Sequence, residues 1–170
     1  AAQTAFELAL SKAPDYLPVI FYLGAVHAAQ DHQEQADYYL GTYLKSAPGS
    51  SAAARLAAGV KVRRNDIDGA TAVLEQAAAA NPKDAVLHDL LGRIYASRGD
   101  PKGIEMLKEA VALQPDSAAL RERLGIAMLL GGQQDEAQAQ IDAAARLDPG
   151  TRQGKYMLVI TAMRERDFKR

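Results

Sequence analysis

The chain has 170 residues, of which 34 are alanine; 48% of its residues are hydrophobic and only 6% are aromatic. This composition favours closely packed helices over a β-sandwich, which needs β-branched and aromatic side chains. The formal net charge of −1 shows no basic excess for a nucleic-acid partner. The absence of cysteine excludes a disulfide scaffold, a Cys-ligated metal site and thiol catalysis.

No apolar run approaches the length of a transmembrane span, and no signal peptide opens the chain. The sequence begins at Ala1 already inside a helical pattern, so we expect it to be part of a longer protein whose targeting segment is absent here.

Five prolines divide the chain at nearly constant intervals. Pro14, Pro48, Pro82, Pro115 and Pro149 are separated by 34, 34, 33 and 34 residues. A fixed period of this length is typical of a repeat architecture.

One helix of each repeat, here called B, precedes the proline. Its residues follow a small, large, small order at positions i, i+4 and i+7, which is one face of a helix. In chain order these sets are Ala2/Phe6/Ala9, Ala36/Leu40/Tyr43, Ala70/Leu74/Ala77, Gly103/Leu107/Ala110 and Ala137/Ile141/Ala144.

A second helix of each repeat, here called A, carries a small residue after an apolar one, which is leucine in three of four repeats. The pairs are Leu23-Gly24, Ala57-Ala58, Leu91-Gly92 and Leu124-Gly125. The small residue predicts a shallow notch where a neighbouring element can approach closely, and each repeat is therefore expected to be two antiparallel helices.

Residues that favour turns and helix caps separate these helices. Ser50, Asp84, Ser117 and Thr151 each follow a proline by two positions and are expected to cap the next A helix. The A-to-B turns are expected at Asp31, Asn65-Asp66, Gly99-Asp100 and Gly131-Gly132. The tripeptide Arg98-Gly99-Asp100 is therefore interpreted as a turn, and Asp100-Pro101 as a cap followed by the first helical position.

Together these residues resemble the tetratricopeptide (TPR) repeat family along essentially the whole chain. The resemblance implies an all-α, right-handed superhelical solenoid of antiparallel helix pairs and a single array over 1–170. The expected parts are a B helix at 1–14, complete repeats at 17–50, 51–84, 85–116 and 117–150, and a final A helix at 152–167. The family's aromatic residue near position 4 is replaced by Ile20, Ala54, His88 and Arg121.

The resemblance also implies a concave groove lined by A helices, in which a protein or peptide segment binds. Carried over position by position, the groove contains two aromatic residues followed by a run of arginines. Guanidinium groups suit carboxylates or phosphates, and aromatics suit stacking on a peptide or sugar. The candidate groove residues are Phe21, Tyr22, Arg55, Arg63, Asp89, Arg93, Glu122, Arg123 and Tyr156.

Two alternatives remain open for the groove arginines. They either contact a ligand or pair with Asp89 and Glu122 and only solubilise the groove. The Lys and Asn residues with which known TPR clamps hold a terminal carboxylate are absent from the corresponding positions, so a clamp of that design is not expected.

No pattern for catalysis, cofactor or metal binding is present. The sequence lacks phosphate-binding glycine motifs and a nucleophile elbow. His27 and His88 occupy slots usually filled by aromatic residues and are interpreted as packing residues, and His32 lies in a turn. We therefore expect no enzyme activity, no cofactor and no metal.

A narrower resemblance concerns the segments F-Y-L-G-A-V-H-A-A-Q and A-A-R-L-A-A-G-V-K-V-R-R. They look like the TPR lipoprotein of the bacterial PEP-CTERM/exosortase system. That resemblance implies a membrane-anchored periplasmic scaffold linked to exopolysaccharide export and protein sorting; a cytoplasmic location is the alternative. Competing functions are a regulatory or substrate-presenting array of a larger enzyme and direct polysaccharide binding.

The last A helix has no following B helix. We expect Leu158, Val159 and Ala162 to be exposed there, and isolated chains to associate end to end through these residues.

Overall fold

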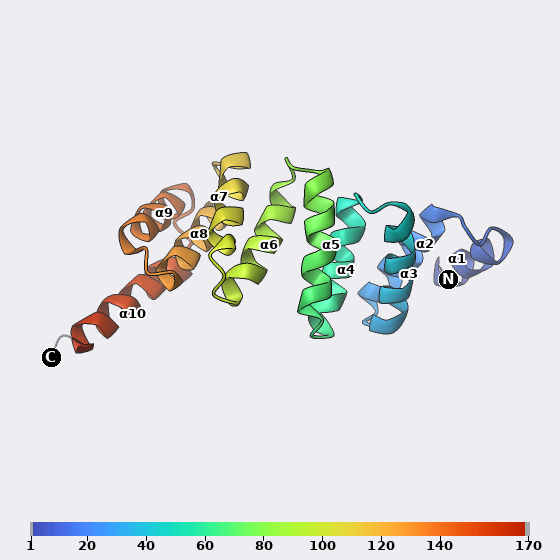
Figure 1. Cartoon of the computed structure of the whole chain (residues 1–170), viewed down its shortest axis with the longest axis horizontal. Coiled ribbons are helices and arrows are strands. Elements are labelled where there is room, and N and C mark those ends of the chain that lie inside the picture. The colour runs from blue at the N-terminus through green and yellow to red at the C-terminus, as the bar shows by residue number, and fades with distance from the viewer. Residues whose placement is uncertain (1, 169–170) are drawn as a thin grey trace. The chain divides into compact units, whose positions relative to one another are not determined.

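The computed structural model describes residues 2–168, and within them it contains ten helices and no strand (Figure 1). The expected all-α fold of alternating A and B helices is confirmed. The helices form two compact units, residues 1–82 and 83–170, which are described separately.

Unit 1 holds five helices. They are α1 (Ala2–Lys12), α2 (Leu17–Ala29), α3 (Gln33–Ser46), α4 (Ser51–Arg63) and α5 (Ile67–Ala80). The A helices are α2 and α4, which pack against the B helices α3 and α5 respectively and also touch each other. The buried residues Leu40 and Val60 form part of the core of this unit, and Phe21 packs against it.

Unit 2 holds the other five helices. They are α6 (Ala85–Ser97), α7 (Lys102–Leu113), α8 (Ala118–Leu130), α9 (Gln134–Leu147) and α10 (Gln153–Phe168). Here α6, α8 and α10 are the A helices, and α8 lies between the other two.

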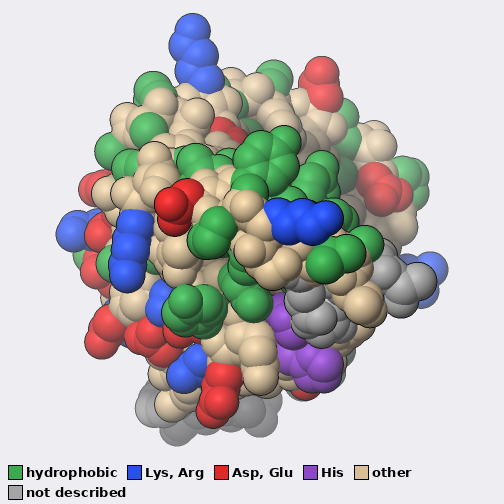
Figure 2. All heavy atoms as spheres, turned by 90° about the vertical axis from the view of Figure 1, so that its right-hand side faces the viewer, with side chains coloured by type: hydrophobic (Ala, Val, Ile, Leu, Met, Phe, Trp, Pro, Cys, Tyr) green, Lys and Arg blue, Asp and Glu red, His purple; other side chains and the backbone are tan. Residues whose placement is uncertain are grey.

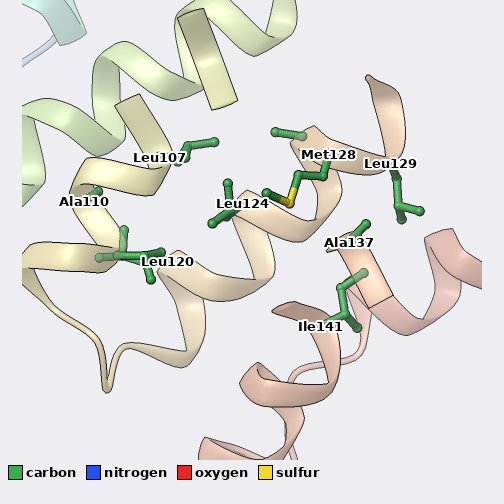
Figure 3. Packing of buried hydrophobic residues seen from close by; sticks show 10 residues of the cluster. Leu107, Ala110, Leu120, Leu124, Met128, Leu129, Ala137 and Ile141 are labelled. Carbon is green, nitrogen blue, oxygen red and sulfur yellow. The ribbon is translucent and has the colours of Figure 1, made fainter. Parts of the chain in front are cut away.

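The core of unit 2 gathers large aliphatic residues from facing helices. Leu107 of α7, Leu124 of α8 and Ile141 of α9 are at most 2% exposed and belong to one cluster (Figure 3). Leu158 of α10 is half-buried against this cluster, so the expectation that it is exposed is wrong. Val159 is 57% exposed, whereas Ala162 lies outside the residues whose side chains are described.

The predicted notches on the A helices hold side chains of the B helices. A Cβ atom added to Gly24 would lie 2.8 Å from Cγ of Leu40, and one added to Gly92 would lie 2.6 Å from Cγ of Leu107. These distances are shorter than van der Waals contact, so each helix pair depends on a residue without a side chain.

Each A-to-B turn contains one residue with left-handed backbone. These residues are Asp31, Asn65, Gly99 and Gly132, with φ angles of 58°, 61°, 70° and 77°. Glycine adopts this conformation freely, and asparagine and aspartate tolerate it better than other residues. The turn residues expected from the sequence are thus confirmed, including Gly99 of the Arg-Gly-Asp tripeptide.

Three of the four predicted caps of A helices form. Ser50, Asp84 and Ser117 accept hydrogen bonds from backbone amides in the first turns of α4, α6 and α8. The hydroxyl of Thr151 instead donates to the carbonyl oxygen of Asp148 at 2.8 Å. The first turn of α10 instead has a side-chain acceptor from another helix, the carboxylate of Glu122 on α8.

At the B helix α7 the cap differs from the prediction, because Pro101 and not Asp100 holds the N-cap position. Oδ1 of Asp100 nevertheless accepts a hydrogen bond from the Lys102 amide.

Candidate binding surface

The candidate groove residues fall on the A helices of both units. We call Phe21, Tyr22, Arg55 and Arg63, on α2 and α4, the unit 1 A face. We call Asp89, Arg93, Glu122, Arg123 and Tyr156, on α6, α8 and α10, the unit 2 A face. Each A helix contributes one of these residues at an equivalent position of the repeat, and the five equivalent residues are Phe21, Arg55, Asp89, Glu122 and Tyr156.

The two aromatic residues of the unit 1 A face, Phe21 and Tyr22, differ in how much of each side chain is exposed. Phe21 is half-buried, and its ring centroid lies 5.3 Å from that of Tyr43 on α3, so much of its surface is used in packing. The Tyr22 ring stacks on that of Phe6 with centroids 5.6 Å apart and remains 52% exposed. Of the two, Tyr22 is therefore the side chain that offers an aromatic surface to a ligand.

The surface at the end of the molecule where α1 lies is mixed in character. Hydrophobic side chains are exposed there among charged ones (Figure 2).

The two arginines of the unit 1 A face also differ. Arg63 pairs with Asp31 over 3.4 Å, but both side chains are largely exposed, so this pair contributes little. Arg55 is exposed and has no ion pair among the described residues. Its guanidinium is thus available to an acceptor on a ligand.

The centre of the unit 2 A face is an ion pair between neighbouring A helices. A guanidinium nitrogen of Arg123 on α8 donates to Oδ2 of Asp89 on α6 over 2.8 Å. The Asp89 side chain is only 9% exposed, whereas that of Arg123 is 41% exposed. A nearly buried carboxylate thus holds an exposed guanidinium in place.

The other carboxylate oxygen of Asp89 lacks a partner. Oδ1 is enclosed and receives no hydrogen bond from any described residue. Buried polar atoms are nearly always hydrogen-bonded, so this oxygen is an exception that needs an explanation.

Glu122 has a structural partner. Its Oε1 accepts a hydrogen bond of 2.9 Å from the backbone amide of Gly154, in the first turn of α10. A carboxylate near a helix N-terminus is favoured by the helix dipole and by the amides that lack partners there. The sequence-based alternative in which the arginines pair with both acidic residues therefore holds for Asp89 with Arg123, but Glu122 binds a backbone amide.

The remaining residues of the unit 2 A face are open to solvent. Arg93 is exposed one helical turn beyond Asp89, and it has no ion pair among the described residues. Tyr156 is 68% exposed on α10. Val86, one turn before Asp89, is 38% exposed. Asp89 is therefore flanked on its own helix by solvent-facing residues.

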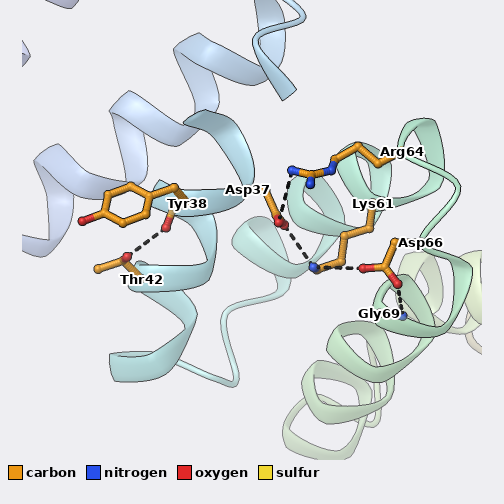
Figure 4. Close-up of polar contacts among 7 residues, drawn as sticks. All are labelled: Asp37, Tyr38, Thr42, Lys61, Arg64, Asp66 and Gly69. Atoms are coloured by element: carbon orange, nitrogen blue, oxygen red, sulfur yellow. Dashed lines mark hydrogen bonds and ion pairs between the residues drawn. The ribbon is translucent and has the colours of Figure 1, made fainter. Parts of the chain in front are cut away.

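A further charged cluster, which the sequence reasoning missed, lies away from the A faces. Lys61 Nζ is 3.0 Å from Oδ1 of Asp37 and 3.3 Å from Oδ2 of Asp66, and Arg64 also contacts Asp37 (Figure 4). Burial alone would lower the pKa of Lys61, but its hydrogen bond and charge interaction with Asp37 raise the pKa above its ordinary value. The hydrogen bond from the Gly69 amide lowers the pKa of Asp66. This cluster joins α3, α4 and the cap of α5, and it stabilises unit 1.

His27 is a packing residue, as its sequence position predicted. His27 is buried, and its ring stacks on Tyr39 with centroids 5.5 Å apart. Its Nδ1 lies 3.3 Å from Nδ1 of His32. Within the described part of the chain, no group of three or more potential ligands is placed to hold a metal ion.

Comparison with known proteins agrees with this architecture. A family model described as tetratricopeptide repeat matches residues 34–94. The structure superposes on MamA with a TM-score of 0.81, 21% identity and coverage of 87% of each chain. It superposes equally well, at 22% identity, on YrrB, described as a TPR protein with an unusual peptide-binding site, covering 95% of this chain and 84% of that one. Residues 34–94 thus match the tetratricopeptide repeat family, and the described chain has the fold of these solved structures.

Two sequence relatives are much longer than this chain. It is 31% identical over 155 residues to protein FlbA of Caulobacter vibrioides, covering 91% of the chain and 26% of the relative. It is 33% identical over 88 residues to the cellulose synthase operon protein C of Pseudomonas fluorescens, covering 51% of the chain and 7% of the relative. The chain thus spans about a quarter or less of the relatives it matches. No helix among the described residues is long and apolar enough to cross a membrane.

Proposed function

We propose that this TPR chain is a non-enzymatic scaffold that binds a segment of a partner protein on its A faces. The observation that carries the proposal is the contrast between two kinds of repeat position. The packing positions recur as small and large apolar residues, whereas the equivalent A-face position changes chemistry as Phe21, Arg55, Asp89, Glu122 and Tyr156. A repeat position whose side chain varies on a constant framework suits recognition of a specific ligand.

The peptide class of ligand has further support. YrrB, whose fold is similar, is described as having a peptide-binding site. The exposed Tyr22, Arg55, Arg93 and Tyr156 offer stacking surfaces and hydrogen-bond donors, which is the mixture that protein-binding surfaces use.

The test is a titration of the ¹⁵N-labelled chain with a library of unstructured peptides, followed by mapping of the amide shifts. We expect the shifts to fall on α2, α4, α6, α8 and α10. Arg93→Ala should weaken binding several-fold, whereas Lys108→Ala, which removes an exposed cation from the B helix α7, should not. Shifts confined to the B helices, or equal effects of the two variants, would contradict the proposal.

Direct polysaccharide binding is the competing ligand class. Acidic glycans and acidic peptides would be titrated in parallel against the wild type and the Arg55→Ala/Arg93→Ala double variant. Tight binding of a glycan together with failure of every peptide would replace the protein scaffold with a carbohydrate-binding array. Equal binding by the double variant would remove the two arginines from the site.

We also propose that the parent protein acts in exopolysaccharide production or protein sorting, membrane-anchored on the periplasmic side of the bacterial envelope. The relative from a cellulose synthase operon supports an exopolysaccharide setting. Fractionation of cells that produce the full-length protein tests the location, because recovery with the cytoplasmic proteins would contradict it. If the full-length protein contains a catalytic domain, the competing function is favoured, in which this chain is a regulatory or substrate-presenting part of an enzyme.

A further inference from the structure

The pair of Asp89 and Arg123 leaves hydrogen-bonding capacity of both kinds: the acceptor is enclosed, and the donors belong to a side chain that is partly exposed on the unit 2 A face. Asp89 Oδ1 is an acceptor without a donor among the described residues. The Arg123 guanidinium has five N–H groups, of which one is used for Oδ2 of Asp89. A ligand that satisfies this pair must therefore present a donor and an acceptor close together.

The charges on the unit 2 A face favour a ligand group without a net charge. Asp89 and Glu122 balance Arg93 and Arg123, so the four formal charges cancel. A carboxylate ligand would approach the two acidic residues as well as the arginines, and like charges that share a site repel each other. A neutral group with both a donor and an acceptor avoids that repulsion.

We infer that Asp89 and Arg123 bind a main-chain amide of an extended peptide segment. The peptide N–H donates to Oδ1 of Asp89, and a neighbouring peptide carbonyl accepts from a free N–H of Arg123. The segment is extended, because in a helix the main-chain groups are already used internally. This inference rests on the proposed function and specifies the ligand chemistry of the same surface.

The surroundings of Asp89 fit such a segment. Val86 and Arg93 flank it on α6 at a spacing of one helical turn, and both are exposed. Oδ1 is enclosed in the free protein, so binding includes a rearrangement of the side chains around it. The neighbouring Arg123 side chain is 41% exposed and therefore has room to move. The buried position of Asp89 strengthens the hydrogen bond, because little water competes for the oxygen.

The experiment removes one peptide N–H at a time. A peptide whose shifts map to the unit 2 A face is resynthesised with a single amide-to-ester replacement at each position in turn. For the wild type, the ester at one position should weaken binding by about tenfold or more, the size expected of a hydrogen bond to a charged group. For Asp89→Ala, the same ester should change the affinity less than about twofold, because its acceptor is gone.

Two further variants make the result specific. Arg93→Ala should weaken all the peptides alike and keep the ester penalty of the wild type. Asp89→Asn, which keeps the size of the side chain, should reduce that penalty, and circular dichroism would verify that each variant is folded. If no ester is penalised in the wild type, or the penalty is equal in Asp89→Ala, the inference is overturned.

The outcomes separate this inference from the proposed function. Peptide binding on the A faces without an Asp89-dependent ester penalty overturns the amide contact alone. If no peptide binds the A faces, both fail.

Discussion

Charges pair in different places in the two units. In unit 1, Lys61, Asp37 and Asp66 join α3, α4 and the cap of α5, away from the A face. In unit 2, Asp89 and Arg123 pair on the A face itself, between two A helices. The same framework of helix pairs thus carries one ion pair away from the A face and one on the surface where we propose that a ligand binds. Position in the repeat, more than the residue types, decides which role a pair has.

The notch glycines of the two units differ in how closely the neighbouring helix approaches them. Replacing these glycines should change the free energy of unfolding more than any other variant below. A Cβ on Gly125 would lie 2.6 Å from Cγ1 of Ile141 and 3.1 Å from the carbonyl oxygen of Ala137. One on Gly24 would lie slightly farther from its neighbours, 2.8 Å from Cγ and 3.2 Å from the backbone nitrogen of Leu40. Gly125→Ala should lower the free energy of unfolding by about 1–3 kcal/mol, and Gly24→Ala by less. Urea denaturation followed by circular dichroism measures both.

Gly41 provides the matched control for these variants. A Cβ there would meet nothing within 4 Å, and the residue lies inside α3. Gly41→Ala should stabilise the protein by about 0.5–1 kcal/mol, because alanine is the better helix former. Destabilisation by all three variants would show that the notch geometry is not the cause.

The ion pairs of the two A faces should differ in strength. Arg123→Met leaves the nearly buried Asp89 without its partner and should cost about 1–3 kcal/mol of stability. Arg63→Met breaks a pair whose side chains are 45% and 69% exposed and should cost less than about 1 kcal/mol. Methionine keeps most of the aliphatic packing in both variants. Equal costs would remove the distinction between the two faces.

The A-to-B turns use different residues for the same backbone conformation. Gly99→Ala should cost about 1 kcal/mol, because φ is 70° there and no atom lies within 4 Å of an added Cβ. Asn65→Gly should change stability by less than about 0.5 kcal/mol, since asparagine tolerates its φ of 61°. Thermal unfolding compares the two variants. A neutral Gly99→Ala would mean that the turn relaxes.

The smallest expected difference concerns pH. The pKa of Asp66 is lowered in the folded protein, mainly by the Gly69 amide. Its stabilisation is therefore fully present above its ordinary pKa near 4 and is lost as the pH falls through the lower folded value. The cost of Asp66→Ala should shrink in acid, whereas that of Ser117→Ala, about 0.5–1 kcal/mol, should not. Denaturation at pH 7 and pH 3 makes the comparison.

The sequence predicted the parts of this structure that depend on local chemistry. The proline period, the notch glycines and the turn at Gly99 each follow from one residue and its spacing. Arg123 directly follows Glu122, the residue equivalent to Asp89 in the next repeat, so the contact between Asp89 and Arg123 also had a signal in the sequence.

The partners of other individual side chains could not be predicted, because the spacing of residues along the chain does not determine where each side chain points. Glu122 points to the amide of Gly154 instead of to an arginine, and Thr151 donates to Asp148 instead of capping α10. Phe21 is turned partly into the core by its contacts with Tyr43. Each outcome is decided by competition among neighbours that meet only in the folded chain.

The left-handed turns also determine where this protein tolerates added sequence. At Gly99 and Gly132 a Cβ would meet nothing within 4 Å, so the chain there borders open space. Exposed loop tips of this kind accept insertions when the backbone on either side keeps its hydrogen bonds. A short epitope or reporter peptide placed after Gly132 would therefore project from the array while the helix pair α8–α9 stays closed.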